Sequence, residues 1–255
     1  EEMRRVGNLS LSISLEGFEE VNDMRRGEGV FDKVMAAMDR LKKYGLIFGT
    51  SICYTRKNIE TVTSDEFLDM IIGKGCRFTW YFHYMPVGND AAPDLLPTKE
   101  QREYMYHRVR EIRGATGGKP IYAMDFQNDG EFVGGCIAGG RNYCHINANG
   151  DVEPCVFIHY SSANIREVTL LEALKQPLFM AYRDRQPFNS NHLRPCPMLE
   201  NPEILQEMIK ETGAKSTDLQ SPESAEHLCS KCKAYACEWK KTADQLWKEH
   251  PHQQK

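Results

Sequence analysis

Residues 134–155, Gly134-Gly135-Cys136-Ile137-Ala138-Gly139-Gly140-Arg141-Asn142-Tyr143-Cys144-His145-Ile146-Asn147-Ala148-Asn149-Gly150-Asp151-Val152-Glu153-Pro154-Cys155, decide how the second half of the chain folds. Asn149-Gly150 lies between two short alternating segments, and both turn residues tolerate positive φ, which predicts a β-hairpin. The hairpin would bring Cys144 and Cys155 together, one on each arm. Cys136 precedes them in a glycine-rich segment whose bare backbone can fold closely around a bound group.

Three thiols in one small volume predict a metal or cluster site, and a fourth candidate, Cys196, stands between two prolines. Soft thiolate ligands select zinc, copper(I) or iron–sulfur clusters. The alternative is that these cysteines are buried and behave as small hydrophobic residues.

Three further thiols, Cys229, Cys232 and Cys237, follow near the end of the chain, the first two with C-x-x-C spacing. Cys229 and Cys232 also share one helical stripe with apolar residues, and no glycine or proline breaks the run. A helix can bury both thiols in its core face, or it can present them to a cluster from positions i and i+3. Both interpretations stay open.

Composition excludes some classes of partner. The chain has 255 residues, 41% of them hydrophobic and 27% charged, with a net charge of −4. This charge gives no reason to expect nucleic acid or an anionic membrane as a partner. No apolar run reaches the roughly 18 residues that span a bilayer, and no signal peptide is recognisable, so a cytoplasmic protein is expected. In that compartment, the nine cysteines are better explained as ligand thiols than as disulfides. Cys53 and Cys76 are expected in the core.

Hydrophobic periodicity predicts alternating strands and helices in the first half. The expected strands are residues 9–15, 47–54, 78–85 and 121–126. The first intervening helix would end at Gly45, and the next two would begin with capping boxes at Thr63-x-x-Glu66 and Thr98-x-x-Gln101. This order indicates parallel βαβ units with right-handed crossovers. Such sheets bind ligands at the carboxyl ends of their strands, where this chain places polar and aromatic residues.

The thiol pattern resembles the auxiliary-cluster region of radical S-adenosylmethionine (radical SAM) enzymes with a SPASM or twitch extension. The matching pattern is Cys136, thirteen residues, Gly150, four residues and Cys155, followed by residues 164–167, Asn-Ile-Arg-Glu. The resemblance implies an auxiliary 4Fe–4S cluster held by cysteines among the candidates above.

Residues 12–27 resemble the fourth strand and following loop of a radical SAM partial barrel. The resemblance implies that Ser12, Ser14 and Glu16 contact the ribose of S-adenosylmethionine, and that Arg25 or Arg26 faces its carboxylate. Asn58 and His83, at the ends of the next two strands, are the remaining candidates for that site. The implied fold is α/β: half of a partial (β/α)6 TIM-like barrel in residues 1–128, then a small α+β auxiliary cluster domain in residues 129–255 with a β-hairpin and C-terminal helices.

The family's cleavage of S-adenosylmethionine implies an oxidoreductase that abstracts a hydrogen atom from a peptide or small-molecule substrate, with a flavodoxin- or ferredoxin-type reductant. The family's C-x-x-x-C-x-x-C motif is absent from this sequence. We therefore expect a fragment that is inactive by itself, with an unpaired strand edge, rather than a degenerate homologue. The alternative function is a non-catalytic iron–sulfur or zinc module for electron transfer or scaffolding.

Overall fold

The computed structural model describes residues 1–114 and 118–249, which divide into two compact units. The first unit comprises residues 1–84 and 94–126, and the second comprises residues 85–93 and the chain from residue 127 onward. Each unit has its own secondary structure, and each is described by itself.

The first unit contains a four-stranded parallel sheet whose strands follow one another in chain order, as predicted. Its strands are β1 (Leu11–Ser14), β2 (Phe48–Tyr54), β3 (Phe78–His83) and β4 (Tyr122–Asp125). In the register, Ser14 lies opposite Ser51, and Tyr54 lies opposite His83. All four predicted strands are therefore confirmed, each slightly shorter than its apolar run.

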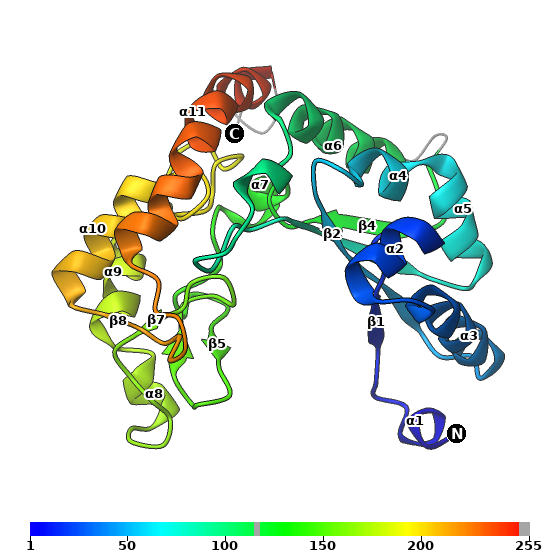
Figure 1. Cartoon of the computed structure of the whole chain (residues 1–255), viewed down its shortest axis with the longest axis horizontal. Helices are drawn as coiled ribbons and strands as arrows, with labels where there is room; N and C mark the ends of the chain where they lie inside the picture. The colour runs from blue at the N-terminus through cyan, green and yellow to red at the C-terminus, as the bar shows by residue number, and fades with distance from the viewer. Residues whose placement is uncertain (115–117, 250–255) are drawn as a thin grey trace. The chain divides into compact units, whose positions relative to one another are not determined.

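Helices cover one face of this sheet (Figure 1). They are α2 (Glu19–Arg26), α3 (Val30–Lys43), α4 (Ile59–Thr63), α5 (Asp65–Gly73) and α6 (Lys99–Ile112). The short helix α1 (Glu2–Val6) precedes the sheet and has no buried residue, and a 3₁₀ turn lies at Pro93–Leu95. The core lies between the sheet and these helices, where Ile52 and Tyr81 of the strands pack with Phe67 of α5 and Val109 of α6. Burial of such side chains is the main source of stability of the unit.

Alternation along the strands separates this covered face from the opposite one. Ile52 and Tyr54 point to the core and are fully buried, whereas Ser51 and Cys53, which alternate with them, are half-buried on the other face. The prediction that Cys53 belongs to the core is therefore wrong, because its position in the strand assigns it to the face of Ser51. The same prediction is confirmed for Cys76, which is fully buried in the core.

The ends of the helices test the predicted capping residues. Thr98 and Gln101 form the predicted capping box at the start of α6. The box predicted at Thr63 is wrong by one residue, because Thr63 ends α4 and the side chain of Ser64 caps α5. Gly45 takes the left-handed conformation just after α3, as expected.

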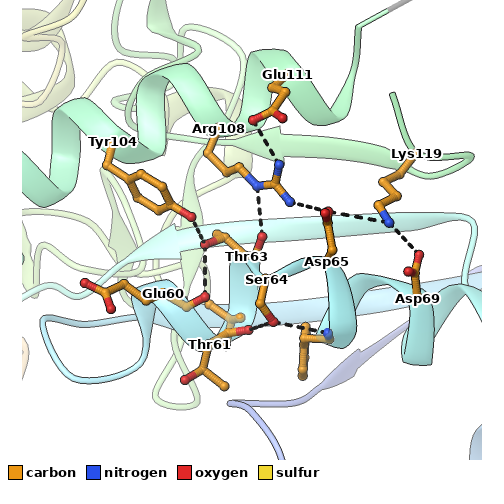
Figure 2. A network of polar contacts seen from close by, with 12 residues as sticks. Glu60, Thr61, Thr63, Ser64, Asp65, Asp69, Tyr104, Arg108, Glu111 and Lys119 are labelled. Carbon is orange, nitrogen blue, oxygen red and sulfur yellow. Dashed lines mark hydrogen bonds and ion pairs between the residues drawn. The ribbon is translucent and has the colours of Figure 1, made fainter. Parts of the chain in front are cut away.

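A polar network joins α4, α5 and α6 at the surface of the first unit (Figure 2). Arg108 of α6 donates hydrogen bonds to the carbonyl of Thr63 at 2.9 Å and to Asp65 at 2.6 Å. Lys119 lies 2.7 Å from Asp69 and 3.5 Å from Asp65. The network therefore fixes the turn between α4 and α5 against α6.

The second unit begins with α7 (Gly130–Val133) and the predicted hairpin, in which β5 (His145–Ile146) pairs antiparallel with β6 (Val152–Glu153). The hairpin is confirmed, and Gly150 has φ +93°. The Asn147 side chain accepts hydrogen bonds from the backbone of Asn149 and Asp151. The loop is thus wider than a two-residue turn.

Short elements complete the second unit. They are β7 (Tyr160–Ser161), α8 (Leu170–Ala173), α9 (Pro177–Arg185), α10 (Pro202–Thr212), β8 (Lys215–Ser216) and α11 (Ala225–Glu249). In this unit β8 pairs antiparallel with β7, with Tyr160 opposite Ser216 and Ser161 opposite Lys215. In the described part of the chain, no helix has the length and apolar character to cross a membrane.

Candidate functional site

Two serines lie on the face of the first sheet that the helices do not cover. Ser12 and Ser14 alternate with Leu11 and Ile13, which pack on the core. The Oγ of Ser12 is buried and has no hydrogen-bond partner among the described residues. A buried hydroxyl without a partner is uncommon in folded proteins and is one sign of a missing ligand or water.

Glu16 follows β1 and is paired with both arginines that the sequence singled out. Its carboxylate is 1% exposed and accepts a hydrogen bond from Arg25 Nη1 at 2.9 Å and another from Arg26 Nη2. The arginines are 42% and 32% exposed. Two guanidinium groups against one carboxylate give this triad a net charge of +1, which favours a bound anion such as a carboxylate.

Asn58 joins the loop after β1 to the loop after β2. Its amide nitrogen donates to the carbonyl of Glu16 at 3.0 Å and to that of Cys53 at 3.2 Å. Its amide oxygen accepts from the backbone of Thr55 at 2.7 Å. Asn58 is therefore close to the triad, but its polar atoms are used to hold the two loops together.

His83 lies apart from these residues. It is paired with Tyr54 on the helix-covered face, is 2% exposed, and its Nδ1 is 2.6 Å from the carbonyl of Tyr84. Burial, with the nearby charge of Arg102, lowers the pKa of His83 to about 3. The structure therefore brings Glu16, Arg25, Arg26 and Asn58 together beside the serine face, and places His83 on the other side of the sheet.

In the second unit, a loop holds Cys136 through its backbone. Arg141 donates to the carbonyls of Val133, Gly134 and Cys136 at 2.8–3.1 Å. The Gln186 amide donates to Cys136 at 3.2 Å and to Ala138 at 3.0 Å. These contacts fix the loop from two sides, so the thiol of Cys136 has a defined position.

The thiols of Cys136, Cys155 and Cys196 lie within electrostatic range of one another. Burial raises the pKa of Cys136 to about 12 and that of Cys155 to about 11, and it also raises the pKa of Cys196. Cys155 further raises the pKa of Cys136, and both of these thiols raise the pKa of Cys196. Buried thiols of this kind ionise only when a cation or cluster compensates their charge.

Among the residues described, no three or more His, Cys, Asp or Glu side chains form a group that could hold a metal ion. In an iron–sulfur cluster each thiolate binds its own iron atom, so the ligand sulfurs surround the cluster without sharing a single ion.

Cys144 stands apart from the three coupled thiols. It packs against Val152 and Phe179 in a small hydrophobic cluster. Burial alone accounts for the raised pKa of Cys144. The hairpin places Cys144 and Cys155 on opposite arms. The Cys144 thiol nevertheless does not belong to the group formed by Cys136, Cys155 and Cys196.

The three C-terminal cysteines lie on α11. Cys229 and Cys232 are fully buried on its core face, beside Leu228 and Trp239, and Cys237 is exposed. Burial raises the pKa of both buried thiols to about 12. The core-face arrangement is the one that the helical stripe indicated.

Sequence reasoning missed three residues of these sites. The thiol of Cys53 lies beside Arg25, whose guanidinium opposes part of the rise in thiol pKa that burial causes. Period-two alternation with Ile52 and Tyr54 could have revealed this position. The other two, Tyr182 and Glu200, lie beside the coupled thiols. No motif singles them out.

A family model described as an iron–sulfur cluster-binding domain, SPASM, matches residues 136–198. Mycofactocin maturase MftC of Mycolicibacterium smegmatis is 31% identical over 156 residues, which is 58% of this chain and 39% of that protein. The AdoMet-dependent heme synthase of Oleidesulfovibrio alaskensis is 23% identical over 214 residues, 74% of this chain and 54% of that protein. The chain thus spans about half the length, or less, of these curated relatives.

A solved structure gives the same fold. Native anSMEcpe with bound AdoMet and Cp18Cys peptide superimposes with a TM-score of 0.53 at 13% identity, over 96% of this chain and 71% of that one. This likeness confirms the predicted fold class. The chain is an α/β protein in which a four-stranded parallel sheet, part of a barrel, precedes a small unit with a hairpin and a C-terminal helix.

Proposed function

Since this chain is homologous to the radical SAM enzymes with a SPASM iron–sulfur domain, we propose that its first unit binds S-adenosylmethionine and its second unit holds an auxiliary 4Fe–4S cluster. The observation that carries the proposal is that Cys136, Cys155 and Cys196 are electrostatically coupled and all fall within residues 136–198, which the SPASM model matches.

The triad at the end of β1 supports the first part of the proposal. Arg25 and Arg26 would bind the carboxylate of S-adenosylmethionine, because Glu16 neutralises only one of their two charges. Ser12 and Ser14 would offer hydroxyls to the ribose, and the partnerless Oγ of Ser12 is available for that bond. Glu16 has further lone pairs for a ribose hydroxyl. Asn58 would hold the two loops at the required spacing.

Aromatic side chains on the same uncovered sheet face support a substrate surface next to this site. Trp80 and Phe82 both contact Phe126, and the rings of Phe82 and Phe126 are stacked at 4.4 Å. Such a surface excludes water from a bound organic molecule.

In a complete enzyme with its own catalytic cluster, S-adenosylmethionine bound here would accept one electron from that cluster and supply the radical that removes a hydrogen atom from the substrate, and the auxiliary cluster would take up an electron from the resulting substrate radical. The substrate we propose is a peptide, since one solved relative contains a bound peptide. A small molecule is the second candidate, because other relatives are heme synthases. The reductant would be a flavodoxin- or ferredoxin-type protein.

Anaerobic reconstitution with iron and sulfide tests the proposal. The expected product is a brown protein whose absorption bleaches on reduction with dithionite, with the electron paramagnetic resonance signal of a reduced 4Fe–4S cluster. Reduced flavodoxin should produce the same signal. A colourless protein that holds one zinc ion per chain would contradict the proposal and would favour a zinc scaffold.

A further inference from the structure

Tyr182 has a buried hydroxyl that no described residue satisfies. The residue is fully buried on α9, and its hydroxyl has no hydrogen-bond partner among the described residues. A buried hydroxyl left in this state is less stable than one that is hydrogen-bonded. A tyrosine that served only to fill space would therefore be replaced by phenylalanine without loss.

The ring of Tyr182 is fixed against the loop that carries Cys136. A Cβ added to Gly139 would lie 2.5 Å from the Cβ of Tyr182, so this ring packs directly on bare backbone. Phe188 meets the ring edge to face at 5.2 Å. Gln186, one turn further along, binds the carbonyls of Cys136 and Ala138.

The same loop is tied to the second cysteine. The backbone N–H of Gly139 donates to the carbonyl of Pro154, the residue before Cys155, at 3.0 Å. Burial raises the pKa of the Tyr182 hydroxyl well above its usual value. The pKa is raised further by four nearby thiols, those of Cys136, Cys155, Cys196 and Cys229. A phenol keeps its proton at neutral pH, so the unpartnered Tyr182 hydroxyl can donate a hydrogen bond.

We propose that the Tyr182 hydroxyl donates a hydrogen bond to a sulfur atom of the auxiliary cluster and thereby raises the reduction potential of that cluster. The inference rests on the proposed function, since it requires the cluster to be present. Reduction adds negative charge to the cluster, so a hydrogen bond to its sulfur stabilises the reduced state more than the oxidised one. Tyr182 is thus a positioning and tuning residue, and it binds no iron.

The test compares reconstituted wild-type protein with Tyr182→Phe in a redox titration followed by electron paramagnetic resonance. We expect equal iron and sulfide content, a lower midpoint potential in the variant, and loss of one exchangeable proton coupling from the electron nuclear double resonance spectrum in D₂O exchange. Equal potentials and equal proton couplings would overturn the inference. The matched control is Tyr160→Phe. The hydroxyl of Tyr160 already donates to the carbonyl of Glu223, so its removal should leave the midpoint potential unchanged.

A second variant covers the case in which Tyr182→Phe fails to retain the cluster. Difluorotyrosine incorporated at position 182 keeps the shape of the side chain and is a stronger donor, so the midpoint potential should rise. An unchanged potential in that protein would also overturn the inference. If the wild-type chain assembled no cluster, both the proposed function and the Tyr182 inference would fail. If the wild-type protein held a cluster but the variants had the same midpoint potential, the Tyr182 inference alone would be contradicted.

Discussion

Glu16 accepts a hydrogen bond from Arg25 at 2.9 Å, and this carboxylate is 1% exposed while its partner is 42% exposed. The pair therefore has a buried anion facing a cation that reaches solvent. Arg26 binds the second carboxylate oxygen. The arrangement links the end of β1 to α2, and it leaves guanidinium N–H groups available for another acceptor.

Glu16→Gln should loosen this connection. Removing the buried charge leaves two guanidinium groups without a counter-ion, and we expect a loss of about 1–2 kcal/mol, less than for a fully buried pair because both arginines reach solvent. Hydrogen–deuterium exchange of the amides in residues 11–31 should accelerate accordingly. Glu19→Gln, at an exposed position of α2, is the control; equal exchange in both variants would contradict the assigned role.

Arg25→Ala and Arg26→Ala should each weaken the binding of S-adenosylmethionine. Charge-assisted hydrogen bonds contribute about 1.5–3 kcal/mol, so at least a tenfold loss of affinity is expected for the arginine that binds the carboxylate. Equilibrium dialysis with labelled S-adenosylmethionine measures the effect. Arg40→Ala, on the exposed face of α3, should bind as the wild type does. Affinities that are equal in all four proteins would exclude this carboxylate site.

The stability of the first unit should depend on pH through His83. The folded-state pKa is lowered to about 3 from an ordinary value of 6.5, so the unfolded chain binds the proton more tightly. The stabilisation by neutral His83 is complete above pH 6.5 and is lost as pH falls towards 3, at most about 1.4 kcal/mol per pH unit. In urea unfolding between pH 4 and 7, His83→Gln should flatten this dependence. The exposed His107→Gln should keep it, and equal slopes in the two variants would refute the attribution.

The sequence predicted the sheet well because its information there is local. Alternation in β2 and the capping box at Thr98 each depend on neighbouring residues, and both are present in the structure. Helix α2 was missed because its sequence is mostly charged, and its position depends on Asp23. That carboxylate accepts from the backbone of Gly29 at 2.6 Å and Phe31 at 2.8 Å, which no periodic pattern shows.

Site residues were predictable only where a motif marks them. The spacing from Cys136 through Gly150 to Cys155 identifies two of the coupled thiols, because the turn between them is encoded locally. Tyr182 reaches the same thiols from α9, through packing on Gly139. Such a contact depends on the tertiary fold, so a single sequence does not reveal it. The separation of Cys144 from Cys196 likewise follows from packing of Cys144 against Phe179.

The central claim is that the second unit holds an iron–sulfur cluster through Cys136, Cys155 and Cys196. The most direct measurement is the iron and acid-labile sulfide content per chain after anaerobic reconstitution, in wild type, Cys155→Ala and Cys53→Ala. Cys155→Ala removes a coupled thiol and should abolish iron retention, whereas Cys53→Ala, in the other unit, should retain as much iron as the wild type. Equal iron content in the two variants would contradict the claim.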